Sequence, residues 1–150
     1  SMLRYAWLNY LKGDLEKAET GYNNALKMER ASLNAALGLL DVAQAKQEQK
    51  GITTAAETVV RISPYNYRAL MILGAYQYQD KDYRKSATTY HKVLLVYPDD
   101  IDAMSGAAWA DLYTGAKREA LAGFKKILSI QPDYTYAQQG YDLLMKKAPK

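Results

Sequence analysis

The spacing of the prolines constrains the fold more than any other feature of this sequence. The chain contains four prolines, and three of them, Pro64, Pro98 and Pro132, recur at one constant 34-residue spacing. An apolar stretch precedes each of the three, and Gly106 and Gly140 repeat the same interval. A fixed period of this length is typical of stacked supersecondary units. The sequence therefore predicts a repeat protein, built from units that stack along an axis.

Each period contains two amphipathic segments. Over 67–79 and over 83–96, apolar residues recur at the spacing of one helix face. The segment 80–82 separates them as a turn, and Gly13 and Gly115 take the same place in their own periods. Proline ends the second helix, because it lacks a backbone N–H and clashes with the preceding turn. Each period therefore predicts a helix–turn–helix hairpin.

Acidic residues follow two of the prolines, at Asp99, Asp100, Asp102 and Asp133. They lie where the period predicts the start of the next helix, whose free N–H groups and positive dipole end favour a carboxylate. The alternative is an acid/base pair or a metal site. We interpret these residues as helix caps, because the chain has no cysteine and no histidine near this cluster. The single histidine, His91, is expected on the surface, and no cofactor or metal is expected.

These residues resemble the tetratricopeptide repeat, a 34-residue helix–turn–helix unit. Two units carry the resemblance most clearly, through Leu73, Gly74, Tyr83, Ser86, Tyr90 and Pro98 in one and Gly115, Ala120, Phe124 and Pro132 in the other. The resemblance implies an all-α fold, a right-handed superhelical solenoid of antiparallel helix pairs. About four units and a terminal helix are expected, approximately over 1–32, 33–66, 67–100, 101–134 and 135–148.

The unit over 33–66 is the poorest copy of the repeat. Gln47 stands at the glycine turn, and the polar residues from Gln44 to Lys50 predict a long first helix with the turn moved toward Gly51. The first unit lacks the opening residues of the repeat. We therefore expect the chain to be part of a longer array.

The resemblance also implies a concave groove lined by the first helices. The groove positions that we predict to contact a partner are Asp41, Arg68, Met71, Tyr78, Trp109, Tyr113 and Tyr136. Further groove positions are Leu3, Trp7, Tyr10, Leu11, Asn34, Leu37, Gln44, Ala75, Gln79, Asp102, Ser105, Leu112, Gln139 and Leu143.

Aromatic residues and arginine are the usual anchors of protein interfaces. The predicted groove is therefore centred on Tyr78, Trp109 and Tyr113, with Arg68 facing a carboxylate of the partner. Alternatively, Trp109 packs against the neighbouring helix and Trp7 covers a terminal repeat.

One function of the family is not expected. Tetratricopeptide domains that hold the acidic tails of heat-shock chaperones resemble one another in a Lys/Asn/Arg clamp on the groove. The corresponding positions of this chain hold Leu3, Trp7, Leu37, Asp41, Met71 and Ala75. The clamp is missing.

Composition further restricts the classes of partner that we expect. Twenty Lys and Arg residues against sixteen Asp and Glu residues give a net charge of +4, spread evenly along the chain, so no nucleic-acid partner is expected. No apolar run approaches the roughly 20 residues of a membrane span, so no membrane insertion is expected. We predict a soluble protein of the cytoplasm or the periplasm.

These observations predict a non-catalytic scaffold that binds a protein or peptide segment, with homo-oligomerisation left open. The alternative hypotheses are a targeting or assembly region of a larger enzyme or of a bacterial envelope export or secretion machine, and a secretion-type chaperone. Full-length gene context would discriminate between them.

Overall fold

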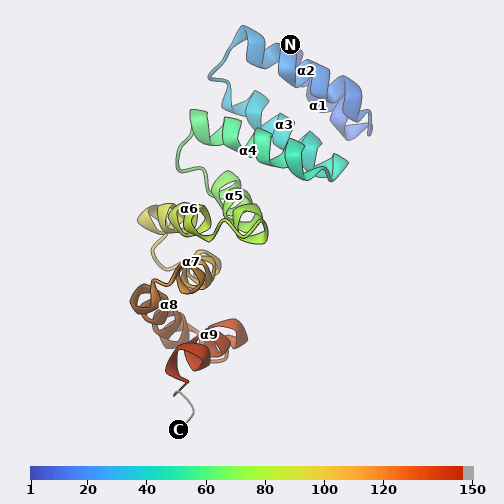
Figure 1. The fold of residues 1–150 in the computed structure, drawn as a ribbon. Helices are drawn as coiled ribbons and strands as arrows, with labels where there is room; N and C mark the ends of the chain where they lie inside the picture. The colour runs from blue at the N-terminus through green and yellow to red at the C-terminus, as the bar shows by residue number, and fades with distance from the viewer. Residues whose placement is uncertain (147–150) are drawn as a thin grey trace. The chain divides into compact units, whose positions relative to one another are not determined.

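Nine helices make up residues 1–146, the part of the chain that the computed structural model describes (Figure 1). They are α1 (Met2–Leu11), α2 (Leu15–Met28), α3 (Leu33–Lys46), α4 (Gln49–Ile62), α5 (Tyr67–Gln79), α6 (Tyr83–Val96), α7 (Ile101–Thr114), α8 (Lys117–Ile130) and α9 (Thr135–Met145). The chain divides into two compact units, residues 1–72 and 73–150, and α5 runs across the division. Within each unit, helices that follow one another in sequence pack side by side.

The all-α fold predicted from the period is confirmed. The helices predicted over 67–79 and 83–96 are α5 and α6, with the same bounds. The terminal helix predicted over 135–148 is α9, which ends at Met145, and residues 147 and 148 lie outside the described residues.

The turns within the hairpins share one backbone geometry. Gly13, Gln47, Lys81 and Gly115 have φ angles of 84°, 59°, 64° and 88°, all in the left-handed region. Successive members of this set are one full period apart in the sequence. Glycine reaches this region without steric cost, whereas a residue with a side chain does so at the expense of some stability.

The prediction of a long first helix in the second hairpin is wrong. α3 ends at Lys46, Gln47 adopts the left-handed conformation, and α4 begins at Gln49, so that Gly51 lies inside a helix. The packing register that the period imposes places the turn here, although the local sequence offers a glycine shortly afterwards.

Short polar side chains cap the N-termini of both first and second helices of the hairpins. The side chains of Asp14, Ser32, Asp82 and Asp100 each accept a hydrogen bond from the backbone N–H three residues later. The cap predicted at Asp100 is confirmed, at 2.8 Å from the Ala103 nitrogen.

Two of the other predicted caps are wrong. Asp99 lies 3.2 Å from the ammonium group of Lys126 and so forms a surface ion pair. Tyr134, and not Asp133, stands at the N-terminus of α9, where no side chain closes the cap. Asp102 lies in the first turn of α7, where its charge opposes the positive dipole end as expected.

The core of residues 1–72 is built on one tyrosine and one glycine. Ala6, Ala18, Tyr22 and Val42 form a buried cluster between α1, α2 and α3. The ring of Tyr22 lies so close to Gly38 that a Cβ atom at that position would overlap it. On the surface of this unit, the ammonium group of Lys46 lies 2.9 Å from Glu16 and 2.5 Å from Glu19, which raises the pKa of Lys46.

Residues 73–150 repeat this packing twice. The ring of Tyr90 contacts both Gly74 of α5 and Gly106 of α7, since a Cβ atom would lie only 2.9 Å and 2.5 Å from it. Phe124 is fully buried in a cluster with Met104, Ala108, Ala120, Ile127 and Ala137, and its ring lies against Gly140. Ser86 strengthens the first contact, because its hydroxyl donates a hydrogen bond of 2.8 Å to the carbonyl of Gly74.

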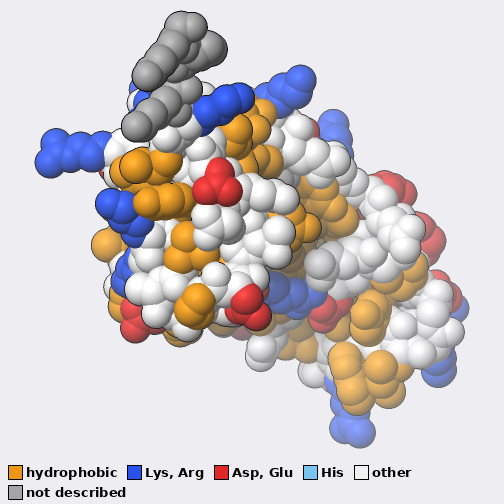
Figure 2. Space-filling view, turned by 90° about the horizontal axis from the view of Figure 1, so that it is seen from below, with side chains coloured by type: hydrophobic (Ala, Val, Ile, Leu, Met, Phe, Trp, Pro, Cys, Tyr) orange, Lys and Arg blue, Asp and Glu red, His pale blue; other side chains and the backbone are white. Residues whose placement is uncertain are grey.

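The surface is mixed in chemistry. Figure 2 shows one face, on which hydrophobic side chains reach the surface among basic and acidic ones. Within the described residues, none of the helices combines the length and the apolar character that crossing a membrane requires.

Candidate functional site

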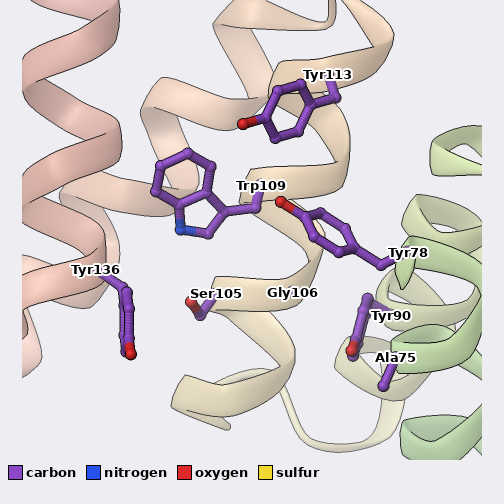
Figure 3. A pocket seen from close by; sticks show the side chains of 8 residues that line it. All are labelled: Ala75, Tyr78, Tyr90, Ser105, Gly106, Trp109, Tyr113 and Tyr136. Carbon is purple, nitrogen blue, oxygen red and sulfur yellow. The ribbon is translucent and has the colours of Figure 1, made fainter. Parts of the chain in front are cut away.

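An open pocket of about 460 Å³ lies within residues 73–150 and contains four of the predicted site residues (Figure 3). We call it the aromatic pocket. Its lining residues are Ala75, Tyr78, Tyr90, Ser105, Gly106, Trp109, Tyr113 and Tyr136. They come from α5, α6, α7 and α9.

Helical spacing places the main lining residues on one face of α7. Ser105, Trp109 and Tyr113 follow one another at i, i+4 spacing and therefore project from the same side of the helix. Figure 3 shows Tyr78 extending from α5 toward Trp109, while Tyr136 faces the same space from α9. The small side chain of Ser105 leaves this space open between the rings.

The rings support one another. The ring centroids of Trp109 and Tyr113 are 6.2 Å apart in a stacked arrangement, and those of Tyr113 and Tyr83 are 4.8 Å apart. Trp109 also meets the buried Phe124 edge to face at 5.3 Å. Trp109 therefore packs against the core, as one interpretation had it, and also lines the pocket, while its contact with a partner stays a prediction.

The aromatic pocket is electrically neutral at its walls. Burial raises the pKa of Tyr78 to about 12, with a further contribution from the neighbouring Tyr113 and Tyr83. Burial also raises the pKa of Tyr90, and the carboxylate of Asp102 adds to this effect. These two hydroxyl groups stay protonated at neutral pH, so the pocket offers ring faces together with hydroxyl donors and acceptors. Such walls suit apolar side chains and backbone amides of an extended segment.

Residues 1–72 contain a related pocket of about 510 Å³, which we call the N-terminal pocket. Its lining residues are Ser1, Leu3, Arg4, Trp7, Tyr22, Asn34, Leu37, Gly38 and Asp41. Five of them, Leu3, Trp7, Asn34, Leu37 and Asp41, are predicted groove positions. Trp7 lines this pocket and remains 51% exposed, and its role in covering a terminal repeat stays a prediction.

The remaining predicted site residues of this unit, Arg68 and Met71, do not line the N-terminal pocket. Arg68 donates a hydrogen bond of 2.7 Å to Asp41 and another to the side-chain oxygen of Gln44. Its guanidinium group is thus engaged by a carboxylate of its own chain. Met71 is partly buried and lines neither pocket.

Tyr83 was not predicted as part of the aromatic cluster. The repeat pattern assigns it to the packing of the hairpin, yet its ring contacts Tyr78 and Tyr113. In a hairpin the first residues of the second helix lie next to the last residues of the first helix. This adjacency could have placed Tyr83 beside Tyr78.

His91 is half exposed, as predicted, and contacts one carboxylate. Its Nε2 atom lies 2.7 Å from Asp111, whose side chain is only 9% exposed. The hydrogen bond to Asp111 raises the pKa of His91, and desolvation opposes part of this effect. The pair joins α6 to α7 outside the pocket.

Solved structures similar to this chain are helical-hairpin repeat proteins. YrrB, described as a tetratricopeptide protein with an unusual peptide-binding site, has a TM-score of 0.79 at 19% identity, over 95% of this chain and 74% of its own. MamA has a TM-score of 0.75 at 17% identity, over 95% and 78%. A tetratricopeptide repeat protein from Parabacteroides merdae has a TM-score of 0.67 at 19% identity, over 95% and 56%.

No family model and no curated protein matches the sequence. The structural likeness, at these identities, shows the fold: this chain has the tetratricopeptide repeat fold. Proteins with this fold commonly bind proteins or peptides, and the fold is typically non-catalytic.

Proposed function

We propose that this chain is a non-catalytic interaction module whose aromatic pocket binds a segment of a protein or peptide. The observation that carries the proposal is the convergence of Tyr78, Trp109, Tyr113 and Tyr136 from three helices on one open space. A large aromatic side chain left at the surface of a folded protein is a common feature of binding sites.

Exposure of the pocket rings supports the proposal. Tyr113 is 52% exposed and Tyr136 is 64% exposed, although each has a large apolar ring. A bound segment would remove these rings from water, and burial of each would contribute on the order of 1–3 kcal/mol. The neutral walls favour a segment whose contacting residues are apolar or aromatic, with its backbone amides bonded to the tyrosine hydroxyls.

The test is a selection of short peptides on the purified chain, followed by calorimetry. Peptides that bind the wild type should lose at least about tenfold in affinity on Tyr136→Ala and on Tyr113→Ala, because each substitution removes an anchor ring. Tyr136 lies outside the buried core, so Tyr136→Ala should change the melting temperature little. Tyr113→Ala also removes the stacking on Tyr83 and Trp109, so it should lower the melting temperature more.

A matched control is available in the other unit. Tyr5 is 54% exposed on α1 and lines neither pocket. Tyr5→Ala should therefore leave the affinity unchanged. Peptides that bind equally well to the wild type and to both pocket variants would show that the aromatic pocket is not the binding site.

A further inference from the structure

A third pocket lies within residues 1–72, on a different set of residues. It has a volume of about 680 Å³ and is lined by Asn23, Leu26, Lys27, Arg30, Thr58 and Arg61. We call it the basic pocket. α2 and the residues just after it supply the first four, and α4 supplies the other two. None of these residues lines the aromatic pocket or the N-terminal pocket.

The basic pocket carries three positive charges without a matching negative one. Lys27, Arg30 and Arg61 line it, and no acidic residue does. None of the three forms an ion pair with a carboxylate of residues 1–146. The acidic residues nearest to them in sequence, Glu29 and Glu57, are exposed and lie outside the lining.

One hydrogen bond holds the guanidinium group of Arg61 in place. The Nη2 atom of Arg61 donates a bond of 3.0 Å to the backbone carbonyl of Arg30. This bond ties the end of α2 to α4 and uses one of the five N–H groups of the guanidinium. The others remain free to bind a ligand.

The repeat period shows that the fold does not require these charges. Lys27 and Arg61 are one period apart and occupy the last turn of successive second helices, where a cation also offsets the helix dipole. The equivalent positions in the next two hairpins are Leu95 and Ser129. The same helix ends therefore form without a basic residue, and the pair of cations is specific to this pocket.

We infer that the basic pocket binds a soluble oxyanion that carries at least two negative charges, such as the phosphate group of a phosphate ester. A single carboxylate would leave two of the three cations unpaired. A phosphate group accepts several charge-assisted hydrogen bonds, and the arginine fork matches its geometry. The amide of Asn23 supplies a further neutral donor at the wall.

Inorganic pyrophosphate is the probe, titrated by calorimetry into the full chain at low ionic strength. Saturable binding with one molecule per chain is expected. Arg61→Gln and Lys27→Gln should each lower the affinity at least about fivefold, and Arg61→Lys should lower it less, because it keeps the charge and loses only the fork. The melting temperature without pyrophosphate should be nearly the same for all these variants.

The control variant is Arg84→Gln, which removes one positive charge from an exposed position of α6. It should leave the affinity for pyrophosphate unchanged. An equal loss on Arg84→Gln and Arg61→Gln would overturn the inference, because binding would then follow the net charge. Binding to vesicles that contain phosphatidylserine, without binding to pyrophosphate, would also overturn it and would assign the patch to a membrane surface.

Discussion

The N-terminal pocket and the aromatic pocket are built on the same frame and lined by different chemistry. In the first, the ring of Tyr22 lies against Gly38, and in the second, the ring of Tyr90 lies against Gly106. The two rings are separated by two periods of the sequence, and so are the two glycines. The frame of each pocket is therefore a repeated packing contact.

The lining positions change between the two pockets. Asp41 in the N-terminal pocket corresponds to Trp109 in the aromatic pocket, and Trp7 corresponds to Ala75. Burial raises the pKa of Tyr22, the ring of the N-terminal pocket, and the negative charge of Asp41 raises this pKa further. In these two pockets the packing residues recur with the period, whereas the residues that line the open space differ. The chemistry of the pocket lining therefore changes here without a change of fold.

The largest expected effect comes from removing Phe124, whose ring packs against Gly140 as Tyr22 and Tyr90 pack against Gly38 and Gly106. Phe124→Ala should lower the free energy of unfolding by about 3–5 kcal/mol, because it empties a fully buried site. In a Trp7→Phe background, the fluorescence of Trp109 should also change, since its edge-to-face partner is lost. Urea unfolding measures the first effect. Ile130→Ala, at an exposed position of the same helix, should change stability by less than about 0.5 kcal/mol.

Adding a methyl group to the frame glycines tests whether the two pockets share their construction. Gly38→Ala and Gly106→Ala should each be about 1–3 kcal/mol less stable than Gly51→Ala, because only the first two force a Cβ atom against a ring. A Cβ atom at Gly51 meets its nearest neighbour, Ala43, at 3.7 Å, an ordinary contact. A large loss at one frame glycine and none at the other would break the comparison.

A smaller effect is expected on the pH dependence of stability, to which residues 73–150 contribute through the pair of His91 and Asp111. Because its pairing with Asp111 raises the pKa of His91, the pair stabilises the folded state fully below the ordinary histidine pKa of about 6.5. This stabilisation is lost as the pH rises through the higher folded-state pKa. The loss should not exceed about 1 kcal/mol, since His91 is half exposed.

The measurement is urea unfolding of the wild type and of His91→Asn at pH 6 and pH 9. Their difference in stability should be larger at pH 6. The other acidic group near the ring, Glu119, acts in the same direction. The equivalent positions of the first unit hold Asn23 and Ala43, which do not titrate. An identical difference at both pH values would contradict the assignment.

The smallest effect is expected from Arg68 and Asp41. Both side chains are substantially exposed, at 40% and 38%, so a double-mutant cycle with Arg68→Ala and Asp41→Ala should give a coupling near the lower end of about 0.2–1 kcal/mol. The coupling should shrink further at high salt. A coupling of several kcal/mol would mean that this pair belongs to the structural frame and not to the variable lining.

Periodicity predicted the helices well because each hairpin repeats the same packing problem. The turn of the second hairpin was predicted wrongly because the local polar sequence and Gly51 outweighed the period, although Gln47 and Lys81 both adopt the left-handed conformation of Gly13 and Gly115. One period after Tyr22 the chain has Ala56, and one period after Gly38 it has Ile72. At this step of the repeat the small residue therefore stands at the ring position and the large residue at the glycine position. Such an exchange is visible only when both positions are read together.

The aromatic pocket was predicted in part. The resemblance to the repeat family placed Tyr78, Trp109, Tyr113 and Tyr136 on the groove face, and they line one pocket. The engagement of Arg68 by Asp41 was not predicted, because it depends on side-chain directions across two helices. The basic pocket was missed as well, although the one-period spacing of Lys27 and Arg61 was a usable signal.

The contact of Tyr90 with two glycines limits how its neighbours can move. The bulk of the ring fits only where a helix presents bare backbone, and one turn away α7 offers Ala103 and Ala110 in place of Gly106. Translation of α7 along α6 by one turn would therefore press a methyl group into the ring. A partner that docks in the aromatic pocket meets walls whose register is locked, so adaptation to it must come from rotation of side chains such as Tyr136.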